Sequence, residues 1–190
     1  YTFALPLQME AVFADRGVGH YSSTLRHLLR PYAHNLAVPE DPSGNPSRQN
    51  IEHETDITPK ADAEGDRLEA HIDTTAAWPD YVLGCARTII SDRADHITLI
   101  DELTLSRELP VTVHFHTPLQ AAPTPSGVSI TGPSIIVGIE PQWECTEIRV
   151  TDDPLGAGEH DPTYRHIALT APIAAKHRLE TRIVLAPKGN

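Results

Sequence analysis

His34 is the residue whose type and neighbours best fit proton-transfer chemistry. The sequence Tyr32-Ala33-His34-Asn35-Leu36 places an imidazole close to a phenol and beside an amide. Imidazole changes its charge near neutral pH, so it can act as a general acid or base. A loop rich in Pro, Ser, Gly and Asn follows and ends at Gln49. The chain holds 11 histidines, so a hydrogen-bonding role at the surface or in the core is the alternative for any one of them.

The local sequence around His34 indicates extended structure. A short apolar stretch, Leu36 to Val38, lies between Pro31 and Pro39, and proline interrupts helical hydrogen bonding. We therefore expect a strand that presents His34. Residues 39–66 are polar and proline-rich, and we expect a long loop there with a short strand at 51–57. Long loops in compact domains often carry function.

A second histidine pair lies in Val111-Thr112-Val113-His114-Phe115-His116. Side chains alternate along a strand, so both histidines face the side opposite to the valines, about 7 Å apart. Two such imidazoles can share a metal or a ligand. A metal needs a third ligand from elsewhere, for which the candidates are His53, Asp56, His71, His160 and Asp161. The alternative is a solvated outer face.

An aromatic pair, Trp78 and Tyr81, flanks a Pro-Asp turn. Such rings offer a large apolar face with a polar edge and can stack on sugars. Packing of the turn against the rest of the domain is the alternative.

The elements that carry these residues are predicted to be strands. The chain has 190 residues with 17 prolines and 11 glycines spread along it, which is typical of many turns between short elements. From residue 67 onward, β-branched segments recur every ten to fifteen residues, with turns at 79–80, 91–95 and 106–108, and this spacing predicts an antiparallel meander. Later segments around residues 127–139, 143–150, 164–172 and 176–187 predict further strands. We expect an all-β fold, a two-sheet antiparallel β-sandwich of ten or more strands.

Composition limits the partners. The formal net charge is −11, so we expect neither nucleic acid nor an anionic membrane surface to bind. Motifs for nucleotides, serine hydrolases and zinc proteases are absent from the sequence. Cys85 and Cys145 permit one disulfide, with buried free thiols in strands as the simpler interpretation. The compartment, periplasmic or extracellular as against cytoplasmic, stays open.

Several segments, in this order, resemble one family. They are RPYAHNLAV from residue 30, NPSRQ from 45, HIDTTAAWPDY from 71, ARTIISDRADHITLIDEL from 86, VTVHFHT from 111 and YRHIALTAP from 164. Together they resemble the C-terminal β-sandwich of the heparinase II/III-like polysaccharide lyases. The resemblance runs from about residue 21 to the C-terminus.

The resemblance implies a function. Such lyases bind a glycan between an N-terminal helical toroid and a sandwich, and they cleave uronic-acid polysaccharides by β-elimination. It implies that His34 is catalytic, and we expect Tyr32, Asn35, Gln49 and Trp78 to bind substrate. Residues 1–190 are too few to include a toroid, so we expect a single sandwich domain of a longer protein, inactive without the helical domain. The alternative is a noncatalytic carbohydrate-binding or interdomain packing module.

The sequence departs from the family beside His34. Some relatives carry a second histidine in an H-x-H pair that helps to hold a structural divalent metal. Here the flanking positions are Tyr32 and Leu36, which argues against a metal of that kind.

Overall fold

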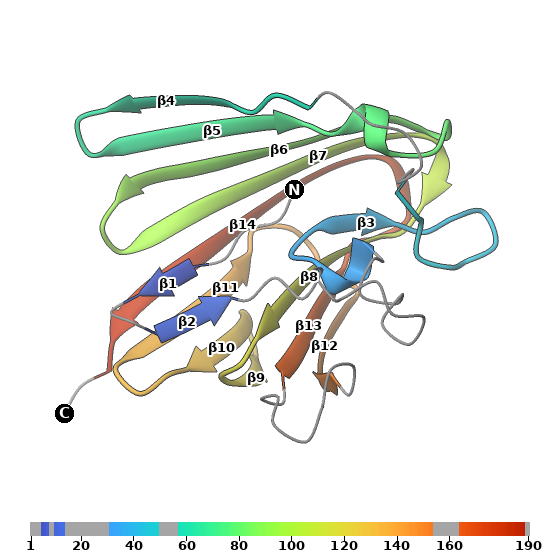
Figure 1. The fold of residues 1–190 in the computed structure, drawn as a ribbon. Coiled ribbons are helices and arrows are strands. Elements are labelled where there is room, and N and C mark those ends of the chain that lie inside the picture. Colours follow the sequence, from blue (N-terminus) through green and yellow to red (C-terminus); the bar gives the residue numbers. More distant parts are fainter. Residues whose placement is uncertain (1–4, 8–9, 14–30, 50–56, 154–163, 189–190) are drawn as a thin grey trace, which may run out of the picture.

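The described chain is built almost entirely of β-strands. The computed structural model describes residues 5–7, 10–13, 31–49, 57–153 and 164–188. Within these ranges the strands form an eight-stranded sheet, a four-stranded sheet and a two-stranded hairpin, and neighbouring strands are antiparallel (Figure 1). The prediction of an all-β, two-sheet antiparallel sandwich is confirmed.

The large sheet has the strand order β4-β5-β6-β7-β14-β11-β10-β9. Its strands are β4 (Lys60–Glu64), β5 (Arg67–Asp73), β6 (Val82–Arg93), β7 (His96–Leu109), β9 (Gln120–Thr124), β10 (Gly127–Thr131), β11 (Ile135–Pro141) and β14 (Ala174–Pro187). Strands β5 to β7 form a meander as predicted from residue 67 onward, and β4 adds to its edge. The fourth predicted strand of the meander, at residues 111–117, lies in the other sheet. The long strand β14 then pairs with both β7 and β11 and joins the two halves of the sheet.

The small sheet has the order β12-β13-β8-β3. Its strands are β3 (Ala37–Pro39), β8 (Val111–Thr117), β12 (Glu147–Asp153) and β13 (Tyr164–Thr170). The separate hairpin joins β1 (Leu5–Leu7) to β2 (Glu10–Phe13), and two short 3-10 helices are η2 (Pro31–Ala33) and η3 (Thr75–Ala77). Pro110 separates β7 from β8 and marks the point where the chain passes from one sheet to the other.

The core lies between the two sheets and follows from side-chain alternation. Val111, Val113 and Phe115 of β8 are fully buried on one face. They belong to one hydrophobic cluster with residues of the large sheet, including Leu99, Leu103, Ile139 and Ile183. The Phe13 ring of β2 lies 5.5 Å from the Phe115 ring, so the hairpin also packs onto this core.

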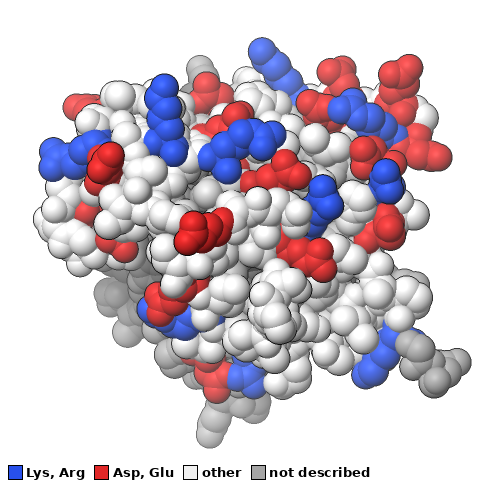
Figure 2. Space-filling model, turned by 180° about the vertical axis from the view of Figure 1, so that it is seen from behind, with Lys and Arg blue, Asp and Glu red and all other residues white. Residues whose placement is uncertain are grey.

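The outward face of the large sheet carries charges of both signs. Arg178 pairs with Glu180 at 3.3 Å on β14, and Arg67 pairs with Glu69 on β5. Figure 2 shows the same mixing of positive and negative side chains over the face seen from behind. A mixed face of this kind is typical of a solvated sheet surface.

Three sequence-based predictions of local structure are wrong. His34 does not lie in a strand, because β3 begins only at Ala37. Residues 60–64, predicted as loop, form the edge strand β4, whose residues are all exposed. Residues 106–108, predicted as a turn, continue β7. The strand predicted at 51–57 lies, except for its last residue, outside the described residues.

No helix in the described ranges is long and apolar enough to cross a membrane.

Candidate functional site

His34 lies in a tight backbone turn between η2 and β3. Its main-chain N–H donates to the carbonyl of Pro31 at 3.0 Å, and its own carbonyl accepts the N–H of Leu36 at 3.0 Å. The residue is half-buried. Pro31, with its fixed φ angle, begins the 3-10 turn that bends the chain before the strand. Tyr32 belongs to η2, and its side chain lies outside the described part of the structure.

Asn35 is fully buried and ties this turn to the small sheet. Its side-chain oxygen accepts the main-chain N–H of His116 at 2.8 Å. The next residue, Leu36, accepts the N–H of His114 through its carbonyl at 2.8 Å. The Asn35 side chain therefore supplies a hydrogen bond where β3 has not yet begun to pair with β8. Direct contact between Asn35 and a substrate stays a prediction.

Gln49 and Trp78, far apart in sequence, line one small pocket of about 20 Å³, which is room for about one water molecule. The pocket lies beside the residues that follow His34, because Leu36 and Ala37 also line it. The structure thus brings two predicted binding residues next to the predicted catalytic segment. The full lining is Leu36, Ala37, Gln49, Ile72, Thr74, Trp78, Cys85, Ala86, Arg87 and Asp101.

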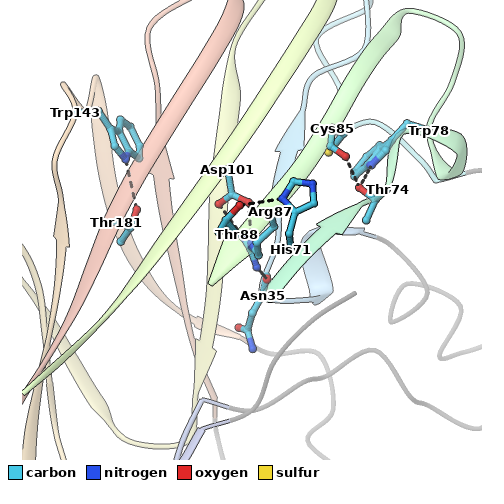
Figure 3. Close-up of polar contacts among 10 residues, drawn as sticks. All are labelled: Asn35, His71, Thr74, Trp78, Cys85, Arg87, Thr88, Asp101, Trp143 and Thr181. Carbon is cyan, nitrogen blue, oxygen red and sulfur yellow. Dashed lines mark hydrogen bonds and ion pairs between the residues drawn. The ribbon is translucent and has the colours of Figure 1, made fainter. Parts of the chain in front are cut away.

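Trp78 is a wall of this pocket rather than an exposed platform. Its side chain is 5% exposed, and its indole N–H donates to the Thr74 hydroxyl at 3.2 Å (Figure 3). Thr74 in turn donates to the carbonyl of Cys85 at 3.1 Å. The nearby Tyr81 hydroxyl shares a hydrogen bond with Ser47, which connects the turn after η3 to the loop that leads to Gln49. The structure therefore agrees with the alternative interpretation of Trp78 and Tyr81, in which their turn packs against the rest of the domain.

A buried ion pair forms the charged side of the same pocket. Arg87 on β6 and Asp101 on β7 lie directly opposite in the sheet register, and they are 6% and 4% exposed. Two parallel contacts join them, Nε to Oδ1 at 2.7 Å and Nη2 to Oδ2 at 2.9 Å. The remaining guanidinium nitrogen, Nη1, donates to the carbonyl of Asn35 (Figure 3). Removing one member of such a pair leaves an uncompensated buried charge, which typically costs about 3–5 kcal/mol.

Sequence reasoning did not single out Arg87 or Asp101 as site residues. Each interrupts an apolar strand with a charge on its inward face, and opposite charges on adjacent strands of a hairpin are a signal for a cross-strand pair. The contact with Asn35 joins residues 52 positions apart, and no local pattern encodes it.

A separate groove of about 330 Å³ lies on the outward face of the small sheet. Its lining residues come from all four strands and the loop after β3, namely Val38, Glu40, Pro46, Thr112, His114, Glu147, Arg149, His166, Ala168 and Thr170. The guanidinium of Arg149 is bidentate to Glu147, with both contacts at 2.7 Å. This groove and the pocket beside Leu36 have no lining residue in common.

Three histidines stack at this groove. The His114 and His166 rings are 5.1 Å apart, and the His116 and His166 rings are 4.8 Å apart, with interplanar angles of 13° and 8°. Nδ1 of His114 lies 2.8 Å from Nε2 of His166. The prediction that His114 and His116 share one face is confirmed, but a solvated face is wrong, because they are only 6% and 2% exposed.

Burial lowers the pKa of one histidine of this stack, His114. Desolvation, followed by the neighbouring His166 and His116, holds the pKa of His114 well below its ordinary value of 6.5. Glu40 at the groove edge has a raised pKa because of desolvation and the nearby Asp41. Among the described residues, no group of three or more His, Cys, Asp or Glu side chains is arranged to hold a metal. The third histidine of the stack, His166, comes from β13 and is not one of the predicted metal ligands. Four of those predicted ligands lie outside the described residues, namely His53, Asp56, His160 and Asp161.

The two cysteines are free thiols. Cys85 is buried in β6, and desolvation raises the pKa of its thiol to about 11. Cys145 is only half-buried and precedes β12, so its predicted place in a buried strand is wrong. Burial also raises the pKa of the Cys145 thiol to about 11. Both sulfurs are therefore protonated at neutral pH and are poor nucleophiles.

The fold of this chain matches a part of several solved heparinase structures. The chain is similar to heparan sulfate lyase HepC from Pedobacter heparinus, with a TM-score of 0.74 and 12% identity over 100% of this chain and 30% of that chain. It is also similar to heparinase III, with a TM-score of 0.70 and 16% identity over 98% of this chain and 29% of that chain.

This likeness shows a shared fold, and the predicted resemblance to the heparinase sandwich is confirmed at that level. The chain spans about 30% of the length of the heparinases it matches. No family model matches the sequence, and no curated protein matches it significantly.

Proposed function

We propose that this chain is the sandwich domain of a lyase that cleaves a uronic-acid polysaccharide by β-elimination, with His34 as a catalytic acid or base. The observation that carries the proposal is the full-length match to the fold of heparan sulfate lyase HepC, combined with the position of His34. This histidine is half-buried in a turn held by both sheets, two residues before Leu36, which lines a small pocket together with Gln49 and Trp78. An imidazole whose main chain is fixed in this way suits proton transfer, which requires a held general acid or base.

In the proposed reaction a base takes the proton from C5 of the uronic acid. The C5–H electron pair forms the C4=C5 double bond, the C4–O4 bond breaks, and an acid protonates the leaving oxygen. Neutralisation of the neighbouring carboxylate makes the C5 proton more acidic. His34 would perform one of the two proton transfers, and Tyr32 and Gln49 would contact the sugar.

The remaining catalytic groups would come from a helical domain of the complete protein. This chain spans about 30% of HepC and of heparinase III, and in this proposal the opposite wall of the cleft would come from sequence outside these residues. The alternative, a noncatalytic carbohydrate-binding module, needs exposed aromatic faces. The burial of Trp78 argues against that role for its indole ring.

The test replaces His34 in the complete protein. His34→Ala should lower the rate of formation of the ultraviolet-absorbing unsaturated product by at least about 10², the usual scale for losing a general acid or base. The assay would use heparan sulfate first and then other uronic-acid polysaccharides.

The matched control is His71→Ala, because His71 is an exposed histidine on the outward face of the large sheet, bonded to Thr88 at 3.0 Å (Figure 3). This variant should keep the wild-type rate. Equal rates for His34→Ala and the wild type would remove His34 from the mechanism, and no product from any uronic-acid polymer would remove the lyase proposal.

A further inference from the structure

The turn that carries His34 is held from both layers of the sandwich. On the side of the small sheet, the His116 N–H donates to the Asn35 side chain, and the His114 N–H donates to the Leu36 carbonyl, both at 2.8 Å. On the side of the large sheet, Arg87 donates to the Asn35 carbonyl. Arg87 therefore connects the large sheet to the residue next to His34.

The chemistry of this contact is specific to arginine. The guanidinium is planar, and its five N–H groups point in fixed directions. Asp101 takes the two parallel N–H groups of one edge, which fixes the plane of the group and aims Nη1 at Asn35. A lysine in the same place would keep the charge but could not make three contacts in this fixed arrangement.

Stability alone does not account for the pair. Replacing a buried ion pair by well-packed apolar residues is often neutral or stabilising, because both charges lose their hydration when they are buried. The inward faces of β6 and β7 are otherwise apolar at Cys85, Leu99 and Leu103. An apolar pair would therefore fit the core at this point, but it would leave the Asn35 carbonyl without this donor.

We propose that Arg87 is a positioning residue for His34. It fixes the main chain beside the imidazole, and Asp101 orients the guanidinium for this task. The inference deepens the proposed function and rests on it, since His34 is the group being positioned. Arg87 lies behind the turn, within the sandwich, and acts through the Asn35 backbone.

The test separates position from stability by changing both charges together. The double variant Arg87→Met, Asp101→Leu leaves no unpaired buried charge, so the complete protein should fold with a melting temperature close to that of the wild type. Its kcat for elimination should fall on the order of 10-fold to 10²-fold with little change in KM, as expected for a misplaced catalytic group. Arg87→Lys should show the same loss of kcat.

Two further measurements report on the position of His34 and do not depend on enzymatic activity. Hydrogen exchange of peptides covering residues 33–38 should be faster in the double variant, because the turn that protects the amides of His34 and Leu36 is released. The rate at which diethyl pyrocarbonate modifies His34, measured by mass spectrometry, should change by at least about threefold as its packing loosens. His71 in the same sample serves as the internal reference.

The matched control removes an exposed pair of the same kind. Arg67→Gln, Glu69→Gln abolishes the pair on the outward face of β5 and should change none of these readouts. Unchanged kcat, unchanged local exchange, or exchange that rises uniformly over the whole chain in the double variant would overturn the inference. Absence of elimination by the wild type would refute the lyase proposal separately, and exchange and modification would still decide whether Arg87 sets the position of His34.

Discussion

At the scale of single residues, hydrogen-bonding partners decide what each histidine can do. His34 is half-buried in a backbone turn, whereas His114 and His116 are buried in a stack with His166. The sequence predicted His34 as the functional residue from its neighbours. It could not predict the stack, because His166 reaches His116 only through the pairing of β13 with β8.

The stack predicts a dependence of stability on pH. The pKa of His114 is lowered in the folded chain by desolvation and by the two neighbouring imidazoles. Because the unfolded chain takes up a proton near pH 6.5 and the folded chain resists it, the free energy of unfolding falls as pH drops below 6.5. The contribution of this one residue is at most about 1.4 kcal/mol per pH unit. Glu40, Glu147 and Arg149 line the same groove and complete its charged surroundings.

The measurement is chemical denaturation between pH 7.5 and pH 5, run on the wild type and on His114→Gln. The variant should lose less stability across this range, because its residue 114 does not titrate. His71→Gln, at an exposed position, should follow the wild-type profile. Parallel profiles for the wild type and His114→Gln would show that this imidazole is not a source of the dependence.

At the scale of elements, the sequence predicted strands well where one face is apolar and poorly at edges. Val111 to Phe115 alternates in sequence as a strand should, and β8 forms there, although both of its faces are buried and only Thr112 is partly exposed. The edge strand β4 has no apolar pattern because all of its residues are exposed. The polar residues Ser106 to Glu108 suggested a turn, but β14 continues to pair beyond them, with Ala174 opposite Leu109.

The strand prediction for the residues just before β3 was wrong for a different physical reason. Pro31 starts a 3-10 turn, and the His34 N–H closes it on the Pro31 carbonyl. The apolar residues Leu36 to Val38 did indicate a strand, yet its pairing with β8 begins only at Ala37. Before that point the Asn35 side chain takes over the hydrogen bond from β8. Such a substitution of side chain for backbone cannot be seen in a hydrophobic pattern.

The β9–β10 hairpin contains a glycine with no room for a side chain. Gly127 has φ +148, and an added Cβ would overlap the carbonyl oxygen of Ile139 and approach Cδ of Pro141 to 3.0 Å. Gly127→Ala should lower the free energy of unfolding by about 2 to 4 kcal/mol, through backbone strain and displacement of β11.

The control is Gly84→Ala in β6, where the nearest atom to an added Cβ is Cβ of Thr104 at an ordinary 3.6 Å. Its stability should stay within about 0.5 kcal/mol of the wild type. Urea denaturation measures both variants. A Gly127→Ala protein as stable as Gly84→Ala would contradict the assigned geometry of this turn.

At the scale of the whole molecule, the fold was predictable because turn spacing and alternation repeat many times along the chain. The segment motifs were enough to indicate the heparinase sandwich, although identity to those structures is only 11 to 16%. The site was less predictable. Gln49 and Trp78 share a pocket beside Leu36, but the Arg87–Asp101 pair that supports it depends on the register between β6 and β7.

The size and charge of the chain predict weak glycan binding by these 190 residues alone. The pocket beside Leu36 measures only about 20 Å³, far below the roughly 300–1,000 Å³ of ligand sites, and the net charge of −11 repels an anionic polymer. Isothermal titration of the chain with heparan sulfate oligosaccharides at low salt should give a Kd above about 1 mM. A longer protein that includes the helical domain should bind the same oligosaccharides more tightly, because it would close the cleft. A Kd below about 100 μM for the 190-residue chain would instead support the carbohydrate-binding module and contradict a cleft shared between two domains.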